Sequence, residues 1–238
     1  MTLSAREIKD IRALGQKKFR QERGLFTVEG TKLVEEALQS DFEVVAVYRT
    51  EDIGESAMQR ITMQTSPTPA LAVVRMKEQD GTLPASGLVL ALDSLRNPGN
   101  VGTIIRLAEW FGIDTVLLSP DCVELYNPKT VQATMGSIFR VRCIYTPLPE
   151  ALEKMKASGM QVFGTFLEGN DIYAAKLPSD AVIVLGSEAD GISPEVARHC
   201  SGKLNIPSFA TGGRGPESLN VAIATALVCS EFRRRSAL

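Results

Sequence analysis

Histidine is almost absent from this chain, and cysteine is sparse. The only histidine among 238 residues is His199, so a histidine-rich metal centre is excluded and a Ser-His-Asp mechanism would depend on one residue. His199 lies in SPEVARHC, a short helical pattern that favours a structural or surface role. The four cysteines, at positions 122, 143, 200 and 229, fit neither a C-x-x-C metal pair nor a dense disulfide framework. We expect buried, reduced thiols and no bound metal.

An excess of positive charge is also missing. The chain has 26 Lys and Arg against 28 Asp and Glu, a net charge of -2, so any surface for nucleic acid must be a local patch. The helical pattern over residues 1–24 is locally basic, and it is typical either of a solvated helix face or of a surface that guides RNA. The basic residues considered for RNA are Lys17, Lys18, Arg20 and Arg23.

Long apolar runs are absent as well. No stretch of about 18 residues is free of charges and helix breakers, and the N-terminus is charged from residue 6 onward. We therefore expect no membrane span, no signal peptide and a cytoplasmic protein.

The length and the pattern of the chain favour two domains. An apolar run, an amphipathic helix and a second apolar run, FTVEGTKLVEEALQS followed by EVVAVYRT, predict a small α/β unit. The segment EQDGTLPASG has no periodicity and places the boundary near residues 78–86. We predict a small α/β substrate-binding domain over 1–80 and a second domain over 87–238.

The second domain has the pattern of an α/β fold with a parallel sheet. Near-continuous apolar strands such as GLVLALD, DTVLLS and AVIVLG alternate with helical segments, which predicts a sheet covered on both faces. Ligands bind such sheets at the carboxyl ends of the strands. Neither G-x-G-x-x-G nor a phosphate-loop Gly-Lys-Ser/Thr occurs in the chain, which disfavours ordinary dinucleotide and nucleoside-triphosphate sites.

Polar residues follow one of these strands in LDSLRNPGNVGTIIRLAEWFGID, residues 92–114. Asn97 and Asn100 offer paired donors and acceptors, and Gly99 and Gly102 permit close backbone approach. Asn100 could instead cap the helix that follows. Arg106 has apolar neighbours in the sequence, where a cation is costly unless it serves a site.

Two later strands also end in unusual loops. AVIVLGSEADGIS, residues 181–193, has a buried-strand pattern followed by Gly186 and Glu188. In LNIPSFATGGRGPESLNVAIATAL a glycine-rich loop leads to Ser218 and Asn220 at the start of an apolar helix. Ser218 could cap this helix, and the free N–H groups of a helix start could bind a polar or anionic ligand group; the two roles are compatible.

The segments NPGNVGTIIRLA, LGSEADGIS and IPSFATGGRGPESLNVAIATAL, in this order, resemble the three signature motifs of the SpoU-type RNA ribose 2′-O-methyltransferases, TrmH-like members of the SPOUT superfamily. The resemblance covers residues 87–235, and FTVEGTKLVEEAL is similar to the substrate-binding domain that precedes it in many members. Two departures concern the loops: Ala189 stands where members usually have Gly, and TGGRGP lengthens the loop before Glu217.

The resemblance implies S-adenosyl-L-methionine as the cofactor, transfer of a methyl group to a ribose 2′-hydroxyl in ribosomal or transfer RNA, a C-terminal trefoil knot and a homodimer. It assigns cofactor contacts to residues at the strand ends and in the third motif: Thr165, Leu185, Gly186, Ile206 and Leu219. It assigns the reaction to polar residues of the three motifs: Arg106, Asn97, Asn100, Glu188, Ser218 and Asn220. An arginine is almost always protonated, so we favour phosphate binding and polarisation of the hydroxyl over a literal general base for Arg106.

Two alternatives remain beside this interpretation. A SPOUT enzyme that methylates a base nitrogen is disfavoured by the Asn-rich first motif with its Arg106. A noncatalytic RNA-binding assembly factor is disfavoured because Arg106, Glu188, Ser218 and Asn220 are all retained. The sequence specifies neither the class of RNA nor the nucleotide.

Overall fold

The computed structural model describes residues 3–78, 80–210 and 217–236, and the chain divides into two compact units. The first unit combines residues 1–78 with 124–140, and the second combines 79–123 with 141–238. None of the described helices is long and apolar enough to cross a membrane.

The first unit contains an antiparallel sheet with the strand order β1-β3-β2 among its described residues. Its elements in chain order are α1 Ala5–Ala13, α2 Lys17–Arg23, β1 Leu25–Glu29, α3 Thr31–Gln39, β2 Val44–Arg49, α4 Thr50–Ile53, α5 Glu55–Ile61, β3 Ala70–Arg75, α7 Pro128–Thr134 and the 3-10 turn η1 Ser137–Phe139. The prediction of one helix over residues 1–24 is wrong, because the helix is interrupted between Ala13 and Lys17. The carbonyl of Leu14, which would accept a backbone hydrogen bond in a continuous helix, instead accepts from the guanidinium of Arg20 at 2.7 Å.

The later segment 124–140 packs into the first unit through buried contacts. Arg20 is only 1% exposed and forms a two-pronged ion pair with Glu124, in which Nε lies 3.1 Å from Oε1. The ring of Tyr126 lies 4.5 Å from that of Phe26 on β1, between centroids. The inclusion of Arg20 among RNA-facing residues is therefore wrong, because its charge is used inside the unit.

The second unit contains six parallel strands in its described residues, with the order β6-β5-β4-β8-β7-β9. Its elements in chain order are β4 Leu88–Asp93, α6 Pro98–Trp110, β5 Thr115–Leu118, β6 Arg142–Tyr145, α8 Leu148–Ala157, β7 Gln161–Asp171, β8 Ala181–Gly186, α9 Pro194–Ala197, β9 Gly202–Asn205 and α10 Val221–Ser236. The predicted α/β class with a parallel sheet is confirmed.

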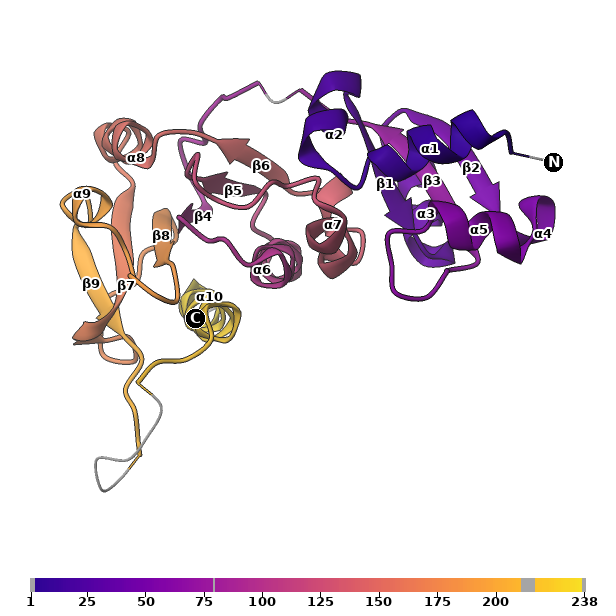
Figure 1. Cartoon of the computed structure of the whole chain (residues 1–238). Coiled ribbons are helices and arrows are strands. Elements are labelled where there is room, and N and C mark those ends of the chain that lie inside the picture. The colour runs from indigo at the N-terminus through magenta and orange to yellow at the C-terminus, as the bar shows by residue number, and fades with distance from the viewer. Residues whose placement is uncertain (1–2, 79, 211–216, 237–238) are drawn as a thin grey trace. The chain divides into compact units, whose positions relative to one another are not determined.

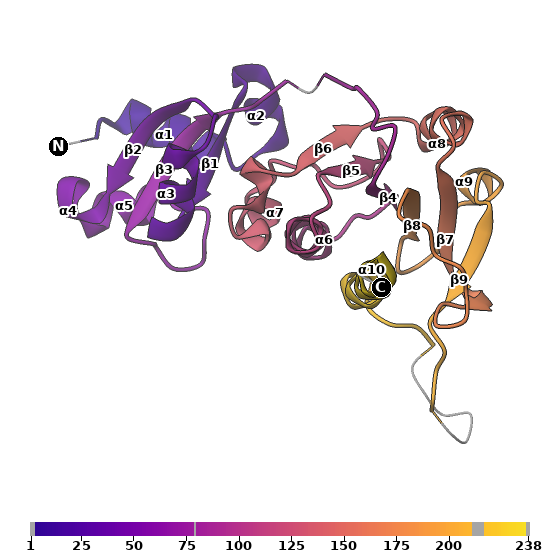
Figure 2. The ribbon, with the colours of Figure 1, turned by 180° about the vertical axis from the view of Figure 1, so that it is seen from behind.

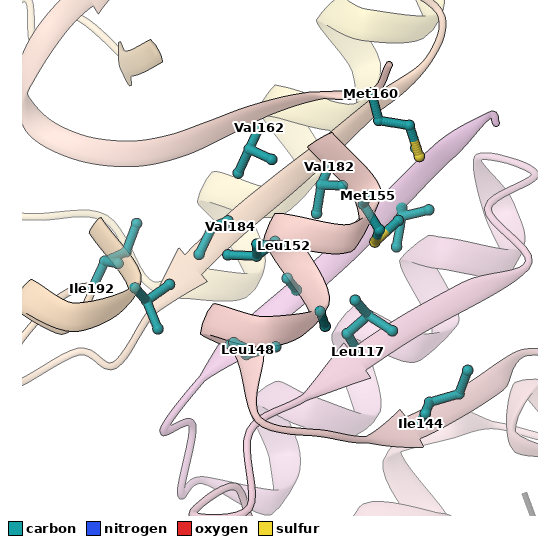
Figure 3. Packing of buried hydrophobic residues seen from close by; sticks show 14 residues of the cluster. Leu117, Ile144, Leu148, Leu152, Met155, Met160, Val162, Val182, Val184 and Ile192 are labelled. Carbon is teal, nitrogen blue, oxygen red and sulfur yellow. The ribbon is translucent and has the colours of Figure 1, made fainter. Parts of the chain in front are cut away.

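Helices cover both faces of this sheet, as Figure 1 shows. On one face, Leu148, Leu152 and Met155 of α8 pack against strand residues such as Val182 and Val184 (Figure 3). Side chains alternate along each strand, so the residues between these face the opposite layer, which contains α6 and α10.

Helices α6 and α10 lie side by side and run in the same direction (Figures 1 and 2). Near their starts, Asn220 Nδ2 donates to Asn100 Oδ1 at 3.1 Å. Near their ends, Arg233 donates to the carbonyls of Phe111 and Gly112 at 2.6 and 2.7 Å. The pair is thus fixed at both ends, and its starts lie at the carboxyl edge of the sheet.

Candidate functional site

The carboxyl ends of β4 and β8 are neighbours in the sheet and carry two of the three motifs. Asp93, the last residue of β4, is paired in register with Gly186, the last residue of β8. The first motif follows Asp93 and the second follows Leu185, so the parallel topology brings them to one edge.

Asn100 joins all three motifs through its side-chain amide. Its Nδ2 donates to the carboxylate of Glu188 in the second motif, and its Oδ1 accepts from Asn220 in the third. These three residues, which we call the amide cluster, come from positions up to 120 apart in the sequence. An amide can donate and accept at once, which explains why an asparagine suits the central place.

The residues that cap α6 and α10 are not the ones considered from the sequence. Asn97, not Asn100, caps α6, because its Oδ1 accepts from the N–H groups of Gly99 and Asn100 at 2.9 and 3.2 Å. Asn220, not Ser218, accepts from the first turn of α10, from Ala222 N–H at 3.0 Å and from Ile223 N–H at 3.3 Å. The proposed capping roles of Asn100 and Ser218 are therefore wrong. Ser218 is exposed beside the helix start.

The second motif forms a tight loop that Gly186 makes possible. Ser187 and Gly191 exchange two backbone hydrogen bonds of 3.0 Å, and Glu188 lies exposed near the tip of the loop. A Cβ at position 186 would lie 2.1 Å from the carbonyl carbon of Gly191 and 2.2 Å from the nitrogen of Ile192. Only glycine leaves room for this close approach of two backbones.

Arg106 lies on the exposed face of α6, although its neighbours in the sequence are apolar. Ile104, Ile105 and Ala108 are fully buried, whereas Arg106 is exposed, because residues so spaced face different sides of a helix. The argument that its position is costly is therefore wrong. Among the described residues, no hydrogen-bond or ion-pair partner holds the guanidinium.

The residues expected to contact the cofactor line the same edge but differ in how far their side chains are exposed. Leu185 is fully buried, so only its backbone can face a ligand. Thr165 and Ile206 are half-buried; Thr165 lies within β7, directly after the point where its pairing with β8 ends, and Ile206 directly follows β9. The hydroxyl of Thr165 donates to the carbonyl of Val184 at 3.2 Å. Leu219 is 45% exposed and adjoins the amide cluster. The lengthening segment TGGRGP occupies 211–216, which lies outside the described residues.

Asp93 is a polar residue of this edge that lies outside the three motifs. Its carboxylate is 3% exposed, accepts from Ser193 N–H at 2.7 Å and accepts from Ser94 Oγ at 3.2 Å. The signal was present in the sequence, because an acid ends the otherwise apolar run GLVLALD.

His199 and the cysteines form no hydrogen bond with the amide cluster among the described residues. His199 Nδ1 is 2.9 Å from Glu153 Oε2 at the surface. All four cysteines are free; three are buried and Cys200 is half-buried. Burial raises the pKa of Cys143 to about 12 and that of Cys200 to about 11, so neither thiol is an activated nucleophile. No group of ligands that could hold a metal ion occurs among the described side chains.

Comparison with known families adds to this geometry. Residues 87–230 match the SpoU rRNA methylase family, and residues 5–77 match the MRM3-like substrate binding domain. The chain belongs to the SpoU rRNA methylase family. The two matches divide at the segment where the sequence pattern changes.

Relatives of this SpoU family member share its full length. A 23S rRNA (guanosine(2553)-2′-O)-methyltransferase of Bacillus subtilis is 30% identical and aligns over 95% of this chain and 96% of its own. A TrmH-family protein from Porphyromonas gingivalis is 39% identical, with a TM-score of 0.86 and coverage of 98% and 99%. An AdoMet-bound rRNA methyltransferase from Sinorhizobium meliloti is 30% identical, with a TM-score of 0.88 and coverage of 99% and 98%. The SPOUT-like fold of the second unit and the separate substrate-binding domain before it are therefore both shared with these structures.

Proposed function

We propose that this protein transfers a methyl group from S-adenosyl-L-methionine to a ribose 2′-hydroxyl in ribosomal RNA. The observation that carries the proposal is the amide cluster, in which Asn100 bonds to Glu188 and Asn220 and so unites the three motifs at the ligand-binding edge of the sheet. The full-length similarity to enzymes named as 23S rRNA 2′-O-methyltransferases supports this choice of reaction and substrate.

The residues at the sheet edge fit this cofactor. An adenosine needs apolar surface and backbone donors and acceptors, and the edge offers Ile206 and Leu219 with the backbone that follows Leu185. When bound, S-adenosyl-L-methionine supplies a methyl group on a positively charged sulfur. Carboxylates at the edge, from Asp93 and Glu188, complement such a charge.

Arg106 is the residue to which we assign the RNA backbone. Its free guanidinium can hold a phosphate oxygen and polarise the ribose hydroxyl at the same time, since it has five donors in a planar fork. The polarised hydroxyl would lose its proton to water as its oxygen takes up the methyl group that the bound cofactor would supply. The amide cluster, with Asn97 holding the start of α6, keeps the first motif in place for this alignment. Ser218 is free to contact a ligand.

Mapping of 2′-O-methyl groups across total RNA, in cells with and without this protein, tests the proposal and identifies the target nucleotide. Loss of one or a few 2′-O-methyl sites in 23S rRNA is the expected result. Loss of a base methyl group instead would favour the base-methylating alternative, loss at a transfer RNA would change the substrate, and an unchanged pattern would favour the noncatalytic alternative. An RNA substrate also suits a cytoplasmic location.

We also propose a homodimer formed through the exposed face of α6 and α10. Ile223 and Leu227 are 55% and 38% exposed along one side of α10, and Leu219, just before the helix, is 45% exposed. Trp110 of the adjacent α6 is 81% exposed. An apolar surface of this kind is typical of protein interfaces. Arg106 lies on the same exposed side of α6 as Trp110, so a second copy would contribute to the surroundings of the reaction. We further propose the C-terminal trefoil knot that the resemblance implies. A knot requires the chain to come back from edge strand β9 toward the middle of the sheet, and α10 packs there against α6 and β8.

Replacing Ile223 and Leu227 with Asp should convert the dimer into monomers. Two charges at apolar interface positions, at about 2 kcal/mol each, should raise the dimer dissociation constant roughly a thousandfold. Light scattering at micromolar concentration measures the mass. Leu38→Asp, at a leucine of the first unit that is 49% exposed, is the matched control and should leave the mass unchanged. A monomeric wild-type protein with intact activity would refute the dimer.

The basic start of the chain is proposed to guide RNA through Lys17 and Lys18, which are exposed on α2. Arg23, which was expected beside them, is half-buried and paired with Asp10 at 3.0 Å. Changing both to Gln should weaken RNA binding and reduce the slope of log affinity against log salt by roughly 1 to 2, since each lost phosphate contact removes about 0.7–0.9. Cofactor affinity should stay constant. The same change at Lys154 and Lys156, exposed on α8, is the control. RNA affinity that is unchanged at every salt concentration would return α2 to a solvated face.

A further inference from the structure

Asp93 places a negative charge inside the second unit, at the end of a central strand. Its side chain is 3% exposed, and its two hydrogen-bond donors, Ser193 N–H and Ser94 Oγ, are both neutral. No ion pair joins it to a cation in the part of the chain that the structure describes. A buried carboxylate without a counter-charge is costly, which indicates that a positive charge complements it in the working state.

The position of Asp93 directs this charge to the cofactor edge. Asp93 pairs in register with Gly186, and its Oδ2 holds Ser193 at the far end of the second-motif loop. The carboxylate therefore lies at the base of the loop assigned to the cofactor. The charge of Asp93 also acts on a nearby thiol: burial raises the pKa of Cys122, and the negative charge of Asp93 contributes to the same shift.

Glu188 is also a carboxylate of this edge, and it differs from Asp93 in exposure. Glu188 is exposed on the loop tip and bonds to Asn100, so water and salt screen its charge. The charge of Asp93 is surrounded by protein, where electrostatic interactions are several times stronger than in water.

We propose that Asp93 is a specificity-determining residue that favours the cationic sulfonium of S-adenosyl-L-methionine over the neutral thioether of S-adenosyl-L-homocysteine. The inference rests on the proposed function. Methyl transfer breaks the S–CH₃ bond, forms the O–CH₃ bond and releases the ribose proton to water, and the sulfur keeps the electron pair of the broken bond and loses its positive charge. The attraction to Asp93 is thereby removed at the moment when the product must leave.

The test compares charged and neutral ligands by calorimetry on the full-length protein. Asp93→Asn removes the charge but keeps an oxygen for Ser193 N–H and an amide donor for Ser94. The affinity for S-adenosyl-L-methionine, and for sinefungin, which carries an amine in place of the methylated sulfur centre, should fall roughly tenfold. This is the effect of one charge at a separation of about 12 Å in protein of effective dielectric about 20. The affinity for S-adenosyl-L-homocysteine should change less than about twofold on the same scale.

Asp114→Asn is the matched control, because Asp114 is an exposed acid at the opposite, amino-terminal edge of the sheet; it should leave all three affinities unchanged. If the three ligands weaken by the same factor, or none weakens, the proposal is overturned. If Asp93→Asn does not fold, as its melting curve shows, Asp93→Ser is measured against the same predictions. Wild-type protein that binds none of the ligands would refute the proposed function itself, an outcome distinct from a failure of Asp93 alone.

Discussion

Arg106→Ala should lower the single-turnover rate of methyl transfer roughly a hundredfold or more. This is the usual scale for the loss of one positioned proton-transfer or charge-stabilising group. The affinity for S-adenosyl-L-methionine should stay near the wild-type value, because the guanidinium is assigned to the RNA. The melting temperature should also be unchanged, since Arg106 is exposed and holds no described partner.

Two further variants separate a specific role from a general effect of charge. Arg106→Lys should rescue poorly, because a point charge lacks the planar fork that can hold a phosphate and a hydroxyl together. Arg198→Ala removes another exposed arginine without a described partner and should keep the wild-type rate. A near-normal rate for Arg106→Ala would contradict the assignment.

Gly186→Ala should lower the free energy of unfolding by about 3 kcal/mol and abolish measurable cofactor binding, because overpacking of this severity cannot be relieved by a side-chain rotation. The new Cβ would meet backbone atoms of Gly191 and Ile192 at 2.1 and 2.2 Å. The second-motif loop must therefore open. Denaturant unfolding gives the stability, and calorimetry with S-adenosyl-L-methionine gives the binding.

Gly191 in the same loop provides the control. Its φ is +68° and nothing lies within 4 Å of a Cβ there, so Gly191→Asn has room and a residue that tolerates the left-handed region. This variant should keep most of the cofactor affinity. Equal losses at positions 186 and 191 would mean that any change in the loop is damaging, and close packing at Gly186 would not be the cause.

The approach of Asn100 and Glu188 could be predicted from the sequence because it follows from topology, whereas the place of Asn220, 15 residues beyond the end of β9, was implied by the resemblance to the family. Apolar strands separated by helices give a parallel sheet, and the carboxyl ends of such strands meet at one edge. The capping residues could not be predicted, because Asn97 and Asn100, or Ser218 and Asn220, are equally suitable in composition. The choice depends on the residue at which the backbone turns into the helix.

The exposure of Arg106 and the burial of Arg20 could not be predicted from the residues next to them in the sequence. Ile105 and Leu107 flank Arg106 in the chain, but the helix turns Arg106 to the opposite side. Arg20 belongs to a run of basic residues, yet its partner Glu124 is 104 positions away. Hydrophobic periodicity contains no information about such a distant pair.

The first unit consists of two segments that are separate in the sequence, and this affects the order in which the protein folds during synthesis. Domains generally fold from the N-terminus as the chain leaves the ribosome. Residues 1–78 must wait for the segment 124–140, because Arg20 has no counter-charge and Phe26 no Tyr126 ring beside it until that segment has been synthesised. By then β4, α6 and β5 of the second unit have already emerged. The two units are therefore completed in an interleaved sequence during translation, and a gene fragment cut at residue 78 would encode a unit that lacks one wall of its own core.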